Sequence, residues 1–499
     1  MPAHLTTRPQ VNGYRFIIRR MEHALVRRDV RMLHEPMRSA SRSLVVGAVL
    51  GTLVMAGFGI AAWISPAPDT DGADILLAEG SGALYVRVEG ERIAAPGPGG
   101  GAVADVLHPA LNLASARLVA GTDAAPSGVP DDHLPDLRRG PVVGIPGAPQ
   151  ILPARDGQIA GPWAVCDELE RGAVAHTNLL IGGGATAADA LTGGAAVLVT
   201  DGEGAYVVHD GARSAVDLGD PQVVRALGLG GVAPVRVSAG LMAALPEGPE
   251  LRAPRIDGAG GLPGFPMADV RVGDVVRVDR GTGGGADGDR YVVLRDGLQA
   301  LPGTVADLIL YSGAGHGLRQ RSIAPESVAD APVTRTPLPL DGYPSGPLRL
   351  RDVEDGTLCV SWASGRRGGG WTAWTGGQGA AGVAGVRLVG ADGAGPSVDR
   401  FVLRPGAAAH VTAVRDSGGG VSAGRADGPR FLVAETGVRY GIPDAATSKV
   451  LGLGDETDPA PWSILGLLPA GPALNRTDAL VMHDGLSPDP APAALLTAD

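Results

Sequence analysis

An uncharged apolar segment of 22 residues, from Ser43 to Ile64, constrains the fold of this chain more than any other feature. As a helix rising 1.5 Å per residue it would span about 33 Å, enough to cross a hydrocarbon core of about 30 Å. Buried helices of soluble proteins rarely carry such a long uncharged run. A cleaved signal peptide would have a shorter one, followed by a small-residue cleavage site. We therefore expect one uncleaved membrane-spanning helix over residues 43–65.

Charged residues are divided unevenly by this segment. Residues 1–42 hold nine Arg and three acidic residues, a balance of +6 in a chain whose net charge is −11, so the remainder carries −17. Because Arg-rich flanks stay on the cytoplasmic side of a membrane helix, residues 1–42 are expected in the cytoplasm. The chain is then expected to be a single-pass protein of the plasma (inner) membrane, with its C-terminal part periplasmic or otherwise outside the cytoplasm.

Several side chains of the apolar segment are typical of a membrane anchor. Gly47 and Gly51 form a GxxxG pattern that can pair two helices, although Gly is common enough in membrane helices for this to arise by chance. Trp63 stands at the far end, where aromatic side chains meet the membrane–water interface. We assign the anchor to these three residues together with Leu44 and Val45.

The basic segment before the anchor has the pattern of an amphipathic helix over residues 15–38. Apolar side chains recur there at three- and four-residue steps, and Arg occupies the other faces. Such a helix can lie on anionic lipid or dock on a partner protein, and both interpretations remain open. Nucleic-acid binding is disfavoured, because the segment is tethered and has no recognisable nucleic-acid-binding fold. The basic residues expected at the contact are Arg15, Arg19, Arg20, Arg27, Arg28 and Arg31.

Beyond the anchor, the composition favours a mainly β fold with short helices. The chain holds 78 Gly and 41 Pro, which interrupt long helices, while 44% hydrophobic residues argue against disorder. Four stretches share a strand–turn–strand–turn–strand pattern in which an aromatic residue begins an alternating segment that ends at Gly. These stretches cover residues 73–96, 195–216, 274–302 and 410–443, and their aromatic residues are Tyr85, Tyr206, Tyr291 and Phe431.

The two cysteines lie at matching places in this repeated plan. Cys166 falls between the first and second repeats and Cys359 between the third and fourth. The order repeat, cysteine segment, repeat is thus written twice, which predicts an elongated exported domain with pseudo-two-fold symmetry around a shared core. The expected parts are repeats at 66–153, 195–254, 265–335 and 406–475, core segments at 154–194 and 336–405, and a C-terminal tail at 476–499.

The matching positions favour one disulfide between Cys166 and Cys359, because disulfides persist outside the cytoplasm. It would close a loop of roughly 200 residues and stabilise the fold by about 4–5 kcal/mol in the chain-entropy model. Two buried free thiols are the alternative. A metal site is disfavoured, because no His lies near either cysteine in the sequence.

Catalytic motifs are matched only by chance in this sequence. A P-loop needs GxxxxGK[ST], and the sole lysine, Lys449, stands in AATSKV without a preceding glycine loop. GxGxxG matches at Gly283/Gly285/Gly288 and Gly377/Gly379/Gly382 are expected among so many glycines, and neither precedes a βα unit. GVSAG at 420–424 matches a nucleophile elbow but lies between two expected strands. We expect no catalytic residue, cofactor or metal.

The N-terminal residues resemble those of a known family. TTRPQVNGYRFIIRRMEHALVRRDVRMLHEPMRSASRS (6–43), followed at once by one membrane helix, resembles the N-terminus of the EccB family of mycobacterial-type ESX (type VII) secretion systems. The resemblance continues through LHPALNLASARLVAG (107–121) and RGPVVGIPGAPQILP (139–153). It implies four repeat domains around a central core and the Cys166–Cys359 disulfide. It also implies self-association and EccC-, EccD- and EccE-like partners, of which EccC is the motor ATPase.

Three functions follow as hypotheses. The first is a non-enzymatic structural subunit of a type VII secretion membrane complex, whose exported repeats form a scaffold. The second is an ATP-hydrolysing enzyme, because EccB proteins are often described as ATPases, although the residues here offer no nucleotide site. The third is an exported module that binds the cell wall.

Overall fold

The computed structural model describes twelve parts of the chain, which divide into two compact units, Met1–Asp71 and Gly72–Asp499. The described residues are 7–28, 30, 36–64, 72–92, 103–183, 189–278, 289–313, 319–353, 355–364, 370–376, 385–415 and 428–486.

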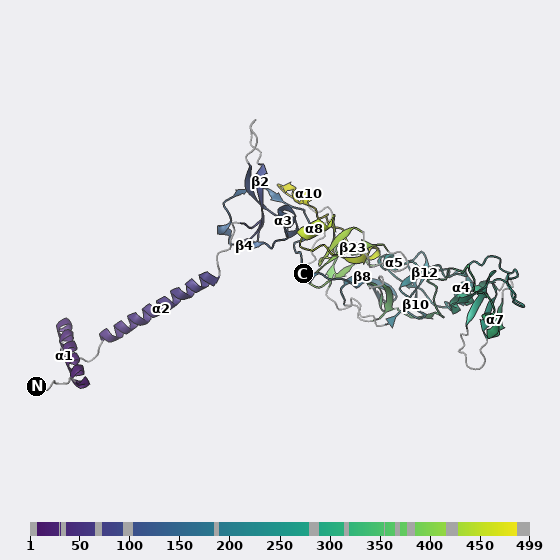
Figure 1. Ribbon diagram of the computed structural model, residues 1–499, viewed down its shortest axis with the longest axis horizontal. Coiled ribbons are helices and arrows are strands. Elements are labelled where there is room, and N and C mark those ends of the chain that lie inside the picture. The colour runs from purple at the N-terminus through teal and green to yellow at the C-terminus, as the bar shows by residue number, and fades with distance from the viewer. Residues whose placement is uncertain are drawn as a thin grey trace, which may run out of the picture. The chain divides into compact units, whose positions relative to one another are not determined.

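The first unit contains two helices, α1 (Arg8–Arg27) and α2 (Pro36–Ile64) (Figure 1). At the start of α1 the Thr7 backbone N–H donates to the Gln10 side chain at 2.9 Å, as in a capping box. The single helix expected over 15–38 is therefore wrong in its C-terminal part. The chain leaves α1 at Arg28, whose φ of 56° is left-handed, and a new helix begins at a proline, which is favoured in the first turn because it lacks an N–H.

α2 includes the apolar segment and extends it on the N-terminal side. Its window Arg42–Ile60 has a mean hydropathy of 2.1, and none of that window is buried against the rest of the described chain. Large apolar side chains such as Leu44 and Leu53 are more than half exposed. Within the described residues, α2 is the one helix long and apolar enough to cross a membrane.

The second unit is mostly β with short helices, and four of its sheets share one topology. Three successive antiparallel strands lead into a helix, and a further strand then returns parallel to the first. In chain order the elements are β1 (Ile75–Ala78), β2 (Leu84–Arg92), β3 (Val103–Pro109), α3 (Leu113–Ala120), β4 (Ser127–Val129); β10 (Ala195–Thr200), β11 (Ala205–His209), β12 (Ala212–Val216), α4 (Pro221–Ala226), β13 (Val235–Arg236); β14 (Val275–Val278), β15 (Arg290–Val293), β16 (Leu298–Leu301), α6 (Gly303–Gly313), β17 (Gln320–Ile323); and β23 (Ala408–Val414), β24 (Arg430–Ala434), β25 (Arg439–Ile442), α8 (Ala445–Val450), β26 (Asp458–Pro461).

A tight turn shows why glycine is needed in these sheets. β11 and β12 are joined by Asp210 and Gly211, with φ of 46° and 80°, the left-handed pair that suits a two-residue hairpin. A Cβ added to Gly211 would lie 2.6 Å from the carbonyl oxygen of Trp371. The turn therefore requires glycine both for its backbone and for its close approach to another strand.

The central sheet has seven strands in the order β21-β22-β8-β7-β19-β20-β9. β7 and β19 pair antiparallel in a register that places Trp163 opposite Trp362 and Cys166 opposite Cys359. Both Trp side chains are almost fully buried, in an apolar cluster that also contains Phe401. The strands are β7 (Trp163–Glu170), β8 (Ala173–Ile181), β9 (Asp189–Ala190), β19 (Gly356–Ala363), β20 (Gly370–Thr375), β21 (Val386–Arg387) and β22 (Arg400–Val402).

Helices link the small sheets to each other and to the central sheet. α3 packs on α8, α4 packs on α6, and both α5 and α9 pack on β7. One cluster joins Val86 and Leu118 to Leu432 and Leu451, so the sheet of β1–β3 shares a core with that of β23–β25. The remaining elements are α5 (Ala239–Ala244), α7 (Pro325–Ala329), α9 (Trp462–Leu465), α10 (Arg476–Ala479), β5 (Arg138–Arg139), β6 (Val142–Val143), β18 (Arg349–Leu350), β27 (Met482–His483) and the 3-10 turns Asp131–His133 and Arg155–Gly157.

The segment interpreted from the sequence as a tail, 476–499, is ordered over its described part, 476–486. It forms α10 and then β27, which pairs antiparallel with β6 so that Met482 faces Val143. Ala479 of α10 is buried in the cluster shared by the first and last small sheets. This stretch therefore joins the first and the last small sheet, which are far apart in the sequence but share one core.

Candidate functional site

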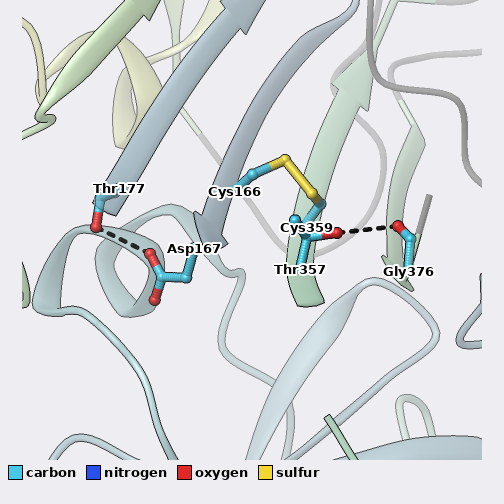
Figure 2. The surroundings of a disulfide bond; sticks show 6 residues. All are labelled: Cys166, Asp167, Thr177, Thr357, Cys359 and Gly376. Atoms are coloured by element: carbon cyan, nitrogen blue, oxygen red, sulfur yellow. Dashed lines mark hydrogen bonds between the residues drawn. A yellow bond between two sulfur atoms is a disulfide. The ribbon is translucent and has the colours of Figure 1, made fainter. Parts of the chain in front are cut away.

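A disulfide between Cys166 on β7 and Cys359 on β19 crosslinks two adjacent strands of the central sheet. The disulfide expected from the sequence is thus present, and it joins two residues separated by 193 positions (Figure 2). The two cysteines are direct cross-strand partners with Cα atoms 4.1 Å apart, and both are buried. In the chain-entropy model, a loop of this length corresponds to a stabilisation of about 4–5 kcal/mol.

Asp167 follows Cys166 and projects from the other face of β7, where it is fully buried. Ser238 donates its backbone N–H to Oδ2 at 2.7 Å and its hydroxyl to Oδ1 at 2.8 Å. The Thr177 hydroxyl also donates to Oδ1, at 2.9 Å (Figure 2). Burial raises the pKa of Asp167 to about 6, because removal from water penalises the charged form more than these three donors stabilise it.

A second buried carboxylate lies beyond Thr177. Asp399 accepts the backbone N–H of Thr177 at 2.7 Å and that of Gly393 at 2.8 Å. Ser238 is also the N-cap of α5, since its hydroxyl accepts the N–H of Leu241. The network therefore ties the β7–β8 hairpin to α5 and to the loop before β22. Sequence reasoning missed it, because no local pattern distinguishes Asp167 from an ordinary turn carboxylate.

His410 on β23 is a third buried ionisable group. Its Nε2 lies 3.1 Å from the Ser448 hydroxyl, and burial is the main cause that lowers its pKa to about 4. It therefore packs as a neutral ring at physiological pH. In the parts of the chain that the structure describes, no three His, Cys, Asp or Glu side chains gather in a way that could hold a metal ion.

The residues predicted for membrane and partner contact lie in the first unit. Arg15, Arg19, Arg20 and Arg27 lie on α1 and are exposed, as is Arg28 at its end, while Arg31 lies outside the described residues. Leu44, Val45, Gly47, Gly51 and Trp63 all lie on α2. A Cβ built on Gly47 or Gly51 would meet nothing within 4 Å, so this stripe of α2 is open to a neighbouring helix.

The sole lysine is not placed for phosphate binding. Lys449 lies in the last turn of α8, with Nζ 3.2 Å from the carboxylate of Asp455. The N-terminus of α8 is capped by Asp444, which accepts the N–H of Thr447 at 2.7 Å, where a P-loop would present free N–H groups to phosphate. Both GxGxxG patterns and the GVSAG pattern lie outside the described residues.

Comparison with known proteins identifies the family. Residues 3–488 match the family described as type VII secretion system ESX-1, transport TM domain B, which is the EccB family. The protein named ESX-3 secretion system ATPase EccB3 of Mycolicibacterium smegmatis is 36% identical, over 98% of this chain and 93% of that protein. The chain therefore belongs to the EccB family of type VII secretion proteins.

Solved structures of relatives agree in fold. A chain of an intact ESX-5 inner membrane complex matches with a TM-score of 0.69 and 32% identity, covering 100% of this chain and 99% of that one. The EccB3 dimer from an ESX-3 core complex matches with a TM-score of 0.65 and 32% identity, covering 82% of this chain and 100% of that one. The mostly β fold with an N-terminal apolar helix is thus that of EccB proteins.

Proposed function

We propose that this protein is a structural, non-catalytic subunit of a type VII secretion membrane complex. The observation that carries the proposal is the match along the whole chain to a subunit of an intact ESX-5 inner membrane complex. The fold has two features that suit such a subunit. One is an apolar helix with an exposed surface, and the other is a large β unit crosslinked by a buried disulfide. Energy for transport would then come from a partner subunit.

In the proposed topology α2 crosses the inner membrane once, residues 1–42 are cytoplasmic and the second unit is periplasmic. The Arg residues before α2 support this orientation through the positive-inside rule. Leu44, Val45, Gly47 and Gly51 would face lipid or a neighbouring helix, with Trp63 at the outer interface. Arg15, Arg19, Arg20, Arg27, Arg28 and Arg31 would contact anionic lipid or a partner subunit.

The second unit is proposed to consist of four repeats related in pairs around the central sheet. A two-fold axis between β7 and β19 would exchange Cys166 with Cys359. It would also exchange β8 with β20 and β22 with β9. The same rotation would make α3 equivalent to α6 and α8 equivalent to α4, so that the α3–α8 contact matches the α6–α4 contact. The shared topology of the four small sheets supports this arrangement.

A pair of side chains gives further support for matching the second repeat with the fourth. Arg213 lies over the ring of Tyr206, and Arg439 lies over the ring of Phe431, with guanidinium carbons 5.2 and 5.7 Å from the ring centres. In both sheets the Arg stands two residues before the cross-strand partner of the aromatic residue. This shared register supports the proposed pairing of the second repeat with the fourth.

Affinity purification of the full chain in mild detergent tests the function. EccC-, EccD- and EccE-like membrane proteins should be recovered with it, together with further copies of the chain, since an EccB3 relative forms a dimer. A variant with Arg15, Arg19 and Arg20 changed to Gln should recover fewer partners while remaining in the membrane. Recovery of the chain without any membrane partner would overturn the proposal.

ATP hydrolysis is the second candidate, because the curated relative carries the word ATPase in its name. It is tested by ATP turnover of the purified full chain, with Lys449→Ala as a matched variant, since Lys449 is the sole lysine. We expect the residual rate to be the same in both proteins and to fall with further purification. A constant specific activity that Lys449→Ala abolishes would establish the enzyme and remove the structural proposal.

A further inference from the structure

A cavity of about 410 Å³ lies at the side of the central sheet formed by β8, β22 and β21. It is bounded by His176 of β8, Arg400 of β22 and Arg387 of β21, with Ala391 and Gly393 leaving room at its edge. Arg400 on β22 is the cross-strand partner of Asn178 on β8, which lies two residues after His176. On its other side, Arg400 is the direct cross-strand partner of Arg387 on β21. Side chains from three adjacent strands therefore converge on one space.

The pairing of Arg387 with Arg400 is unfavourable by itself. Like charges directly opposite each other in an antiparallel pair destabilise a sheet. Among the described residues Arg387 is exposed and no carboxylate forms an ion pair with it, whereas Arg400 forms an ion pair with Glu168 at 3.6 Å. The two guanidinium groups thus have one ion-paired carboxylate between them, and an anion held between the two would relieve the remaining repulsion.

A carboxylate in the cavity wall does not supply this compensation. Asp399 is almost fully buried, and its two oxygens already accept the backbone N–H groups of Thr177 and Gly393. Among the described residues neither oxygen of Asp399 forms an ion pair with Arg387 or Arg400. Guanidinium groups form paired charge-assisted hydrogen bonds with oxyanions, and a tetrahedral dianion can bridge two of them.

We propose that this cavity binds a phosphate group between Arg387 and Arg400, with His176 as an additional donor. The site is separate from the membrane contacts and from the disulfide, and it does not depend on the structural role proposed above. Its ligand is either free phosphate or the phosphate ester of an envelope lipid or polymer, since both present the same oxyanion.

Calorimetric titration of the full chain in detergent, at constant ionic strength, tests the site with inorganic phosphate, glycerol 3-phosphate and acetate. We expect saturable binding of at least one phosphate compound to one site per chain. Tighter binding of inorganic phosphate would assign the free ion, and tighter binding of glycerol 3-phosphate would assign an ester. No saturable binding, or acetate binding as tightly as phosphate, would overturn the proposal.

Three variants locate the site. Arg387→Gln should weaken phosphate binding at least tenfold, because it removes a charge-assisted contact. Glu168→Gln should strengthen binding several-fold by removing the carboxylate that competes for Arg400, a gain that misfolding cannot produce. Arg255→Gln is the control, since Arg255 is 96% exposed in its side chain and lies elsewhere. If Arg255→Gln and Arg387→Gln weakened phosphate binding equally, the loss would come from the change in net charge alone, and this result would overturn the proposed site.

Discussion

The candidate membrane helix α2 and the central β-sheet distribute apolar and polar groups in opposite ways. α2 satisfies its backbone internally and leaves its apolar side chains exposed, as suits the lipid environment that we propose for it. The central sheet buries Trp163, Trp362 and Phe401, and with them it buries the carboxylate of Asp167. The helix is therefore sensitive to any added charge, whereas the sheet depends on particular partners brought together from distant segments.

The largest effect is expected in α2. Changing both Val49 and Leu53 to Arg places two charges in the middle of the span, at about 2.5–3.5 kcal/mol each on the insertion scale. We expect most of the protein to be lost from the membrane fraction in carbonate extraction. The matched variant with both residues changed to Ala should remain in the membrane. Full retention of the double-Arg variant would show that α2 is not the anchor.

The disulfide is expected to give the next largest effect. Changing both Cys166 and Cys359 to Ala should lower the free energy of unfolding by about 4 kcal/mol, because the closed loop is long. Chemical unfolding of the two proteins measures the difference. Each single variant should lose nearly as much as the double, since either one removes the bond. A double variant as stable as the parent would contradict the stabilising role of the bond.

The buried carboxylate should make stability depend on pH. The folded-state pKa of Asp167 is raised to about 6, whereas an unfolded Asp titrates near 3.9, so the folded chain retains a proton that the unfolded chain loses. The contribution of Asp167 to stability should be largest below about pH 4 and should fall by up to about 3 kcal/mol as pH rises from about 4 to above 6.

Unfolding at several pH values tests this dependence. Asp167→Asn should flatten the fall, because the variant has no proton to lose at this position. Asp257→Asn is the control, since Asp257 is 99% exposed in its side chain, and it should keep the parent's slope. An unchanged slope in Asp167→Asn would remove Asp167 as the cause.

The smallest effect compares two threonines of the central sheet (Figure 2). Thr177→Val removes a donor to the Asp167 carboxylate and should cost about 1.5–3 kcal/mol, because bonds to charged groups are the stronger ones. Thr357→Val removes a donor to the Gly376 carbonyl and should cost about 0.5–1.5 kcal/mol. Unfolding free energies measured at pH 7 give the order, and the reverse order would contradict the account of the network.

Local signals could be predicted from the sequence. The apolar run from Ser43 to Ile64 specifies α2, because hydropathy along a helix needs no distant partner. Asp210 and Gly211 specify a tight turn through their own backbone preferences. The Cys166–Cys359 disulfide was also expected, because the two cysteines lie at matching places in the repeated plan and outside the expected membrane segment.

Long-range pairings could not be predicted in this way. The parallel return of β4 to β1 and the pairing of β27 with β6 join segments whose own sequences are short and unremarkable. The contact of Asp167 with Ser238 depends on α5 packing against β7. Likewise, the Arg387–Arg400 pair becomes visible only when the register of β21 and β22 is known.

The most direct test of the central claim, that this EccB protein is a structural subunit, is the mass of the particle extracted from its own membrane in mild detergent. Light scattering corrected for detergent measures it. We expect a particle several times heavier than the 50.3 kDa chain, containing more than one copy of it together with other membrane proteins. A single chain of 50.3 kDa that hydrolyses ATP by itself would contradict the account.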